Sequence, residues 1–192
     1  MDAPAARRGQ IIFLNGTSSS GKTSIAEQLL QVLGPPYFHL SVDAINGMRA
    51  KARTLELGPQ ELQDVLARTR AGFHRVIAGM AQAGNDIVVD YVLSERWRLL
   101  DCLTVLAAFD VVFVGVRCPL AELERRELSR ANRQSGHAAS KLERVHAHGL
   151  YDLECDTSLL SPRDCALQIR DFLAQRTGPS AFDRLRASRW PG

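Results

Sequence analysis

The sequence lacks two features that would place it in a membrane or in an oxidising compartment: long apolar runs and closely spaced cysteines. None of its 192 residues belongs to an apolar run of the roughly 18 residues that a membrane span requires, and residues 1–8 show no signal-peptide pattern. The cysteines lie ten or more residues apart, without the paired spacing of zinc sites or redox dithiols. We therefore expect a soluble, cytoplasmic protein without a membrane partner, and reduced, buried thiols at Cys102, Cys118, Cys155 and Cys165.

The sequence also has little excess of charge of either sign. Its formal net charge is +3, and 45% of its residues are apolar, which suits one globular domain. A charge this small does not by itself indicate nucleic-acid binding. Only the arginines near the C-terminus favour such binding, namely Arg184, Arg186 and Arg189, so we expect no nucleic-acid partner.

Short apolar runs alternate with longer segments of helical period, and no run is followed by a two-residue hairpin turn. This alternation predicts parallel strands joined by helices. Residues 87–89 and 111–114 are apolar without alternation, which indicates strands covered on both faces. The expected strands cover residues 10–14, 37–42, 86–92 and 110–116, with a weaker fifth at 151–155.

In the longest segment between these runs, apolar residues recur at helical spacings, and Gly84 ends the pattern. We therefore predict an α/β fold over residues 1–176, with a five-stranded parallel sheet flanked by helices. Residues 177–192 contain two prolines and three arginines, and we expect them to form a loosely held C-terminal extension. The expected helices cover residues 22–32, 59–83, 95–107, 119–129 and 162–174.

The most specific motif in the sequence lies between the first expected strand and the first expected helix. It reads glycine, any four residues, glycine, lysine, then serine or threonine, which is the pattern of a phosphate-binding loop, or P-loop. Backbone N–H groups of such a loop point at phosphate oxygens, and the following helix places its positive end there. An ordinary glycine-rich turn is the alternative, but the strand before the motif and the helix after it favour nucleotide binding. The nucleotide-binding residues would be Gly16, Thr17, Ser18, Ser19, Ser20, Gly21, Lys22 and Thr23.

The motif and the strand ends predict a catalytic arrangement. Lys22 would reach the β- and γ-phosphates, and the Thr23 hydroxyl would ligate Mg²⁺. Asp43 follows the second expected strand and Asp90 lies late in the third, where ligands of open parallel sheets collect, so both should face the P-loop. Asp90 would help to hold magnesium, and Asp43 would accept the proton of an attacking hydroxyl. The two roles could also be exchanged, and Asp43 could instead cap a helix over residues 44–50.

A group of arginines follows the fourth expected strand. Arg126, Arg130 and Arg133 are spaced to share one face of a continuing helix. Small P-loop kinases carry arginines on a mobile lid at this point of the chain, where they offset charge on the transferred phosphoryl group. We expect such a lid at about residues 125–140, although a solvated basic face is the alternative. No asparagine is followed by lysine, which weakens the interpretation as a GTPase.

With these motifs the sequence resembles the chloramphenicol phosphotransferase family, small P-loop kinases that use ATP to phosphorylate a hydroxyl of the antibiotic. The resemblance runs over roughly residues 11–165. It implies ATP and Mg²⁺ as cofactors, chloramphenicol or a similar hydroxyl compound as acceptor, Asp43 as the base and Arg130 and Arg133 on the phosphates. Family members often carry two consecutive aspartates after the third strand, whereas Tyr91 takes the second position here. Apart from the P-loop, the matching stretches are residues 41–43, 87–90, 95–98, 114–118, 145–146, 151–152 and 156–157.

Several other side chains have two interpretations. We expect Trp97 in the core rather than stacked on an acceptor, and His146 as a structural hydrogen-bonding group near the nucleotide. Arg117 would contact the adenine-side loops or form a surface salt bridge. Residues 156–157 would lie near the adenine base or form a simple turn.

Other functions remain open at this point. The acceptor could be a nucleoside, a sugar acid or an amino-sugar nucleotide, as in the similar zeta-toxin kinases. Outside enzymes, the chain could be a nucleotide-responsive binding protein that has lost phosphoryl transfer, although Asp43, Asp90 and the lid arginines argue against this.

Overall fold

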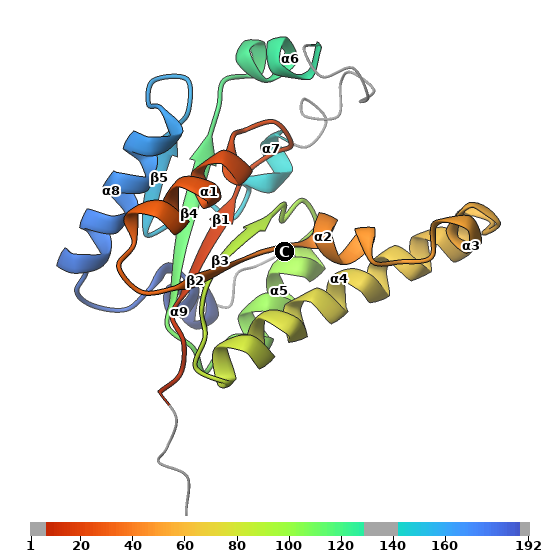
Figure 1. Ribbon diagram of the computed structural model, residues 1–192, viewed down its shortest axis with the longest axis horizontal. Helices are drawn as coiled ribbons and strands as arrows, with labels where there is room; N and C mark the ends of the chain where they lie inside the picture. The colour runs from red at the N-terminus through yellow and green to blue at the C-terminus, as the bar shows by residue number, and fades with distance from the viewer. Residues whose placement is uncertain (1–6, 129–141, 189–192) are drawn as a thin grey trace, which may run out of the picture.

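The protein is built around one parallel sheet. The computed structural model describes residues 7–128 and 142–188 of the chain. Five strands lie in the order β2-β3-β1-β4-β5 and every neighbouring pair is parallel, so β1 is central (Figure 1). The strands are β1 (Ile11–Asn15), β2 (Tyr37–Ser41), β3 (Asp86–Tyr91), β4 (Val111–Arg117) and β5 (Leu153–Asp156).

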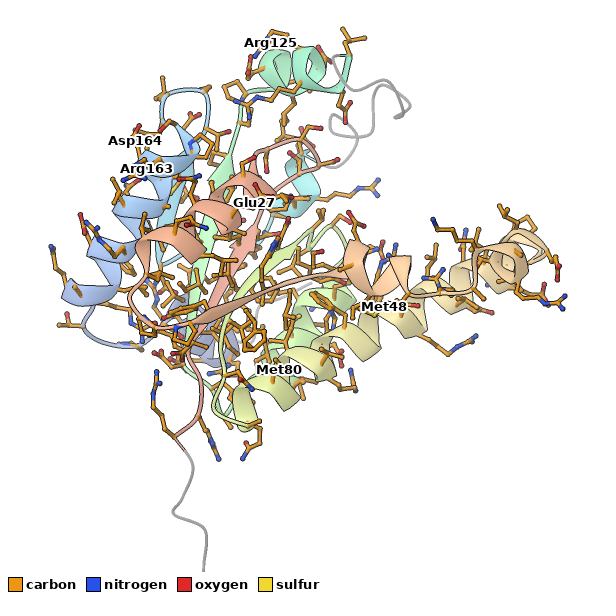
Figure 2. The ribbon with its side chains drawn as sticks, viewed as in Figure 1. Glu27, Met48, Met80, Arg125, Arg163 and Asp164 are labelled. Atoms are coloured by element: carbon orange, nitrogen blue, oxygen red, sulfur yellow. The ribbon has the colours of Figure 1, made fainter. Side chains whose placement is uncertain are left out.

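Helices cover both faces of this sheet. α1 and α8 pack on one face, and α4, α5 and α9 pack on the other. Figure 2 labels Glu27, Arg163 and Asp164 on the first pair, and Met80 on α4. The described helices are α1 (Lys22–Val32), α2 (Val42–Gly47), α3 (Lys51–Leu55), α4 (Pro59–Gln82), α5 (Arg96–Val105), α6 (Leu120–Leu128), α7 (Leu142–Val145), α8 (Pro162–Gln175) and α9 (Ala181–Ala187).

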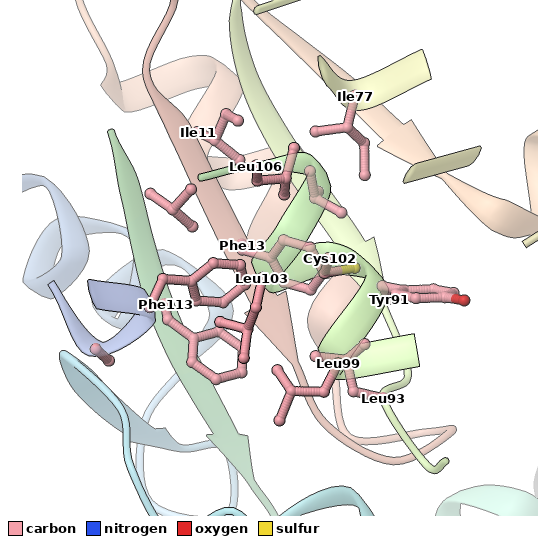
Figure 3. Packing of buried hydrophobic residues seen from close by; sticks show 14 of the residues in the cluster. Ile11, Phe13, Ile77, Tyr91, Leu93, Leu99, Cys102, Leu103, Leu106 and Phe113 are labelled. Carbon is pink, nitrogen blue, oxygen red and sulfur yellow. The ribbon is translucent and has the colours of Figure 1, made fainter. Parts of the chain in front are cut away.

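The alternation of side chains along β1 divides the core into two layers. Phe13 points into the layer formed with α4, α5 and α9, whereas Ile12 and Leu14 point into the layer formed with α1 and α8. These three side chains are fully buried. In the first layer, shown in Figure 3, the rings of Phe13 and Phe113 lie 5.8 Å apart in an edge-on arrangement. The sheet is therefore internal, as its apolar runs predict.

The helices begin and end where local sequence signals predict. α1 has the expected bounds, and α4 ends before Gly84, whose φ of 92° is readily adopted only by glycine. α8 begins with a capping box, in which the Ser161 hydroxyl accepts from the Asp164 N–H and the Asp164 carboxylate accepts from the Ser161 N–H. The predicted α/β fold with five parallel strands is confirmed.

The C-terminal segment differs from the expectation of a loosely held extension. Ser180 and Asp183 form a capping box at the start of α9. Phe182 is fully buried, with its ring 5.6 Å from Phe13 and 4.9 Å from Phe113. Burial of such a side chain contributes about 2–3 kcal/mol. The expectation is wrong for residues 180–187, because one cap and one aromatic side chain fix the helix on the core.

α2 and α3 form an arm that projects from one side of the sheet together with the first half of α4 (Figure 1). Neither α2 nor α3 has a buried residue. Met48, labelled in Figure 2, is 79% exposed and Leu55 is 87% exposed. Within residues 7–128 and 142–188, no helix is both long and apolar enough to cross a membrane.

Candidate active site

The P-loop connects the central strand β1 to α1. Its backbone is tightly folded: a Cβ atom added at Gly16 would lie 2.5 Å from the Val116 carbonyl oxygen, and Gly21 and Ser19 have φ values of 95° and 63°. Glycine is required at the first position by this close approach, and it is favoured at Gly21 by the left-handed conformation. The loop therefore adopts a shape that turns successive N–H groups toward one point, at the positive end of α1.

Lys22 and Thr23 lie directly beside Asp90. The Lys22 ammonium donates to the Thr17 carbonyl oxygen at 2.7 Å and lies 3.7 Å from Asp90 Oδ1. The Thr23 hydroxyl donates to Asp90 Oδ2 at 2.5 Å. Asp90 is brought here by strand register, because it pairs with Leu14 of β1, two residues before the loop. The sequence expectation that Asp90 faces the loop agrees with this geometry.

A cavity of about 120 Å³ joins the P-loop to Asp43 and Asp90. Ser18, Lys22 and Thr23 line one side, and the two carboxylates line the other with part of α2. Asp43 does not cap α2. The Ser41 hydroxyl is the cap, accepting from the Ala44 N–H at 3.2 Å, so the capping alternative for Asp43 is wrong. Asp43 lies in the first turn of α2 instead.

The loop residues fit a triphosphate. The hydroxyl oxygens of Ser19 and Ser20 are buried and make no hydrogen bond within the described residues, so donors stay available in the loop. Lys22 is 6% exposed and supplies a positive charge at low dielectric. The Thr23 and Asp90 oxygens suit Mg²⁺, which is usually held by one or two carboxylates together with substrate phosphates. Accordingly, the described residues contain no all-protein metal cluster.

Arg126 and Thr157 contact each other and the P-loop backbone. The Arg126 guanidinium donates to the Thr157 carbonyl oxygen at 2.7 Å and to the Thr157 hydroxyl at 3.0 Å. The Thr157 hydroxyl in turn donates to the Ser20 carbonyl oxygen at 2.8 Å. Thr157, directly after β5, thus holds the P-loop in place through its hydrogen bond to Ser20. The segment is therefore more than a simple turn.

The remaining arginines near the end of β4 and in the expected lid segment have separate positions. Arg125 lies on the exposed side of α6, where Figure 2 labels it, and pairs with Glu122 at 2.7 Å. Arg130 and Arg133 lie outside the described residues. Arg117 forms a salt bridge with Glu154 at 2.6 Å, which agrees with the surface alternative.

Sequence reasoning missed a buried hydrogen-bond network centred on Asn15. The Asn15 side chain accepts from the Leu93 N–H at 2.9 Å and donates to the Val145 carbonyl oxygen at 2.9 Å and to the Tyr151 hydroxyl at 2.8 Å. Nδ1 of His146 lies 2.6 Å from the same hydroxyl. The sequence signal for this network was an asparagine at the end of an apolar strand. The structure shows that this asparagine is fully buried, so its polar atoms need hydrogen-bond partners.

Two histidines in this region stay neutral. Burial, together with the smaller effects of Arg117, His148 and Lys22, lowers the pKa of His146 to about 3. Burial also lowers the pKa of His148 to about 4. His146 therefore acts as a hydrogen-bonding group, as expected.

Tyr91, at the position of the second aspartate of the family pattern, is among the residues that line the cavity, but its hydroxyl contacts a buried histidine rather than the loop. Its side chain is buried, and its hydroxyl lies 3.2 Å from Nε2 of His74, whose Nδ1 lies 2.6 Å from Asp101 (Figure 3 labels Tyr91). Burial raises the pKa of Tyr91.

Trp97, expected in the core, is 37% exposed and its indole N–H donates to Glu95 at 2.7 Å, so that expectation is wrong.

The fold and this loop define the class of the protein. Five parallel strands, a P-loop after the central strand and carboxylates beside it are the features of a P-loop kinase, and the chain is an enzyme of this phosphotransferase class. Residues 9–174 match the family described as chloramphenicol phosphotransferase-like protein. The chain belongs to that family.

Known proteins are similar to the chain along most of its length. Proteins of two Mycobacterium tuberculosis strains, which carry the provisional name of O-phosphotransferase, are 28% identical over 203 residues, covering 93% of this chain and 88% of theirs. The Mycobacterium tuberculosis APS kinase structure has a TM-score of 0.67 at 21% identity, covering 87% of this chain and 98% of that one. The Acinetobacter baumannii shikimate kinase has a TM-score of 0.61 at 15% identity, covering 88% and 95%. These two structures support the fold.

Proposed function

We propose that the protein transfers the γ-phosphoryl group of ATP to a hydroxyl group of a small molecule, with chloramphenicol or a similar compound as the acceptor. One observation carries the proposal: Asp43 and the P-loop line the same cavity. A carboxylate opposite a phosphate-binding loop is the arrangement that phosphoryl transfer to a hydroxyl requires. Membership of the chloramphenicol phosphotransferase-like family supports the choice of acceptor.

Each residue would have a defined part in the transfer. The acceptor oxygen bonds to the γ-phosphorus, the bond from that phosphorus to the β–γ bridging oxygen breaks, and ADP leaves. Asp43 takes the proton that the acceptor hydroxyl loses. Lys22 and the loop N–H groups stabilise negative charge on the migrating group, and Arg130 and Arg133 would add to this from the lid.

Magnesium would be held by Thr23, Asp90 and the nucleotide phosphates. When bound, it supplies positive charge to the phosphate oxygens. The 2.5 Å contact between the Thr23 hydroxyl and Asp90 keeps the two protein ligands together before the metal enters. The protein would accordingly bind ATP more tightly when Mg²⁺ is present.

The proposal is tested by incubating the protein with ATP, Mg²⁺ and each member of an acceptor panel. The panel holds chloramphenicol, nucleosides, sugar acids and amino-sugar nucleotides, and ADP release is followed by mass analysis of the product. We expect a phosphorylated chloramphenicol. Product formed only from another panel member would move the acceptor assignment to that class, and no product from the whole panel would overturn the proposed transfer.

The role of Asp43 is tested by Asp43→Asn, which keeps the side-chain shape and removes the proton acceptor. We expect turnover to fall by about 10²–10⁴-fold while ATP affinity changes little, because general-base catalysis contributes about that factor. Asp64→Asn, on an exposed face of α4, is the matched control and should keep wild-type turnover. Wild-type turnover in Asp43→Asn would exclude Asp43 as the base.

A further inference from the structure

Three polar side chains form a chain of contacts through the core layer on the α4 side of the sheet. Nδ1 of His74, on α4, lies 2.6 Å from Asp101 of α5. Nε2 of the same ring lies 3.2 Å from the hydroxyl of Tyr91, the last residue of β3. His74 is fully buried, and Tyr91 is 1% exposed within an apolar cluster. The proposed transfer assigns no part to these three side chains.

The direction of the hydrogen bonds follows from the charge of Asp101. The Arg75 guanidinium donates to both carboxylate oxygens of Asp101, at 2.7 and 3.1 Å, and these bonds lower the pKa of that carboxyl. Burial lowers the pKa of His74, so its ring is neutral near pH 7. A charged carboxylate only accepts hydrogen bonds, so the proton of the neutral ring lies on Nδ1. Nε2 is therefore an acceptor, and the Tyr91 hydroxyl donates to it.

Packing and this hydrogen bond together fix the Tyr91 ring. Its centroid lies 5.4 Å from that of Phe73 and 6.2 Å from that of Phe13, both in edge-on arrangements. Figure 3 shows the hydroxyl directed away from Phe13. Because a buried hydroxyl requires a partner, His74 selects the orientation of the ring in which the hydrogen bond is made.

The orientation of Tyr91 affects Asp90 because the two residues are neighbours on β3. Successive side chains of a strand point to opposite faces, so Tyr91 points toward α4 and Asp90 toward α1. The contacts of Asp90 agree with this: it accepts from the Thr23 hydroxyl at 2.5 Å and lies 3.7 Å from the Lys22 ammonium. A tilt of the last residue of β3 would therefore move the Asp90 carboxylate relative to both groups.

The position of this carboxylate matters for magnesium. Tyr91 stands where family members often carry a second aspartate, so the end of β3 offers one carboxylate, that of Asp90. Mg²⁺ demands near-ideal octahedral geometry at short distances, so a single protein carboxylate must be held at a defined position. An anchor on the residue next to Asp90 supplies such a constraint.

We propose that Asp101, His74 and Tyr91 form a positioning chain that orients Asp90 for magnesium, and so determines how tightly the protein binds the magnesium complex of ATP. The three residues act through Asp90 rather than by contact with the phosphates. This inference rests on the proposed function for the role of Asp90 at the metal, but not for the identity of the acceptor.

Tyr91→Phe tests the chain, because it removes the hydroxyl and keeps the ring. ATP binding is measured by isothermal titration calorimetry without an acceptor, in Mg²⁺ and again in EDTA. We expect the dissociation constant in Mg²⁺ to rise about threefold to tenfold, the effect of one hydrogen bond. In EDTA it should stay within twofold of the wild type, because the P-loop is unchanged. An unchanged dissociation constant in Mg²⁺ would overturn the proposal.

Tyr37→Phe is the matched control. The Tyr37 hydroxyl donates to Gln10 at 2.9 Å, and Tyr37 pairs with Asp86 at the opposite end of β3 from Asp90. The variant loses a hydrogen bond of the same kind without a change near the metal site. We expect wild-type dissociation constants under both conditions. Equal weakening in the two variants would indicate a general structural effect and would overturn the positioning chain.

A double-mutant cycle tests whether His74 acts through Tyr91. His74→Leu removes the acceptor of the Tyr91 hydroxyl and should weaken ATP binding in Mg²⁺ to a similar extent as Tyr91→Phe. Because the two residues act in series, the double variant should bind within twofold of the weaker single variant. If the two effects multiply in the double variant, the residues act independently and the chain is wrong.

These binding measurements separate the inference from the proposed function. They use no acceptor, so they remain informative when the acceptor panel yields no product. Weaker binding in Mg²⁺ by Tyr91→Phe, with Tyr37→Phe unchanged, supports the chain even in that case. Conversely, phosphorylated chloramphenicol together with unchanged binding by Tyr91→Phe would support the transfer and overturn the chain.

Discussion

The two ends of the candidate active site are held in place very differently. At the phosphate end, Thr17, Ser20 and Lys22 are almost fully buried, and the loop is tied to β5 and α6 by Thr157 and Arg126. On the side that carries Asp43, where the proposed function puts the acceptor, α2 and the following helix α3 expose every one of their residues at least in part. Burial and hydrogen bonds fix the first region, whereas α2 is held by the Ser41 cap and by the half-buried side chains of Val42 and Ile45, which pack against the core.

Under the proposed function, this difference would separate the part of the site that binds the phosphates from the part that binds the acceptor. Stabilising the charge of a transferred phosphoryl group requires donors held at fixed positions, because reorganisation during the reaction would cost part of the stabilisation. An acceptor wall has no such requirement and can adjust to its ligand. Changes at the phosphate end should therefore reduce the rate strongly, and changes on the arm should alter acceptor binding modestly.

Removing the Lys22 charge should give the largest effect. Lys22→Ala deletes the ammonium that lies 2.7 Å from the Thr17 carbonyl oxygen and 3.7 Å from Asp90. We expect kcat to fall by about 10³-fold, since loss of one preorganised electrostatic contact costs about 10²–10³-fold and an uncompensated Asp90 charge adds to it. Steady-state ADP release measures the change, with thermal unfolding as a check that the variant is folded.

Arg53→Ala is the matched control for Lys22→Ala, because it also removes one positive charge, but from the arm. Arg53 is exposed, and among the described residues its one ion pair is with Glu56, directly after α3, at 2.9 Å. Its loss should leave kcat within twofold of the wild type. If both variants lose activity equally, the contrast between the two ends is wrong.

Acid should destabilise the buried network beside the phosphate site. The pKa of His146 is lowered to about 3 and that of His148 to about 4, chiefly by burial. In the unfolded chain both rings take up protons below pH 6.5, whereas in the folded chain they stay neutral, so stability is greatest above pH 6.5 and falls as the pH is lowered toward 4. Each ring contributes a slope of about 1.4 kcal/mol per pH unit.

Urea unfolding at several pH values measures this slope. His146→Asn removes one of the two titrating rings and retains a polar group near Tyr151, so it should lower the slope between pH 6 and pH 4.5 by about 1.4 kcal/mol per unit. A slope identical to that of the wild type would mean that His146 is protonated in the folded protein, and the buried network would then need another description.

The sequence predicts the phosphate end well because its signals are local. The glycines of the loop, the lysine that opens α1 and the apolar strands around them are adjacent in the chain, so one short pattern specifies both conformation and chemistry. Asp90 follows from the same reasoning, since parallel strands end at one edge of the sheet. These features need no knowledge of distant contacts.

The features that sequence reasoning missed depend on distant partners. Asn15 contacts Leu93, 78 residues away, and Val145, 130 residues away, and no periodicity reports such pairings. Phe182 shows the same limit. A single aromatic residue in a seven-residue helix has too short a pattern to indicate burial, yet its fit between two core rings fixes α9. For Trp97 the error is the reverse: burial was predicted, but the side chain is partly exposed, as large apolar side chains on a helix surface can be.

Met48 gives the smallest expected effect and tests the acceptor end directly. Its side chain is 79% exposed at the end of α2, so Met48→Ala leaves no cavity and should change the free energy of unfolding by no more than about 0.5 kcal/mol. Because α2 also carries Asp43, the acceptor KM can shift by up to about threefold through small movements of the helix, while the KM for ATP stays constant. Urea unfolding and steady-state kinetics measure the two effects. A loss of stability above about 2 kcal/mol would show that the arm is packed against another surface in solution, and its exposure would then no longer explain why the acceptor end is adaptable.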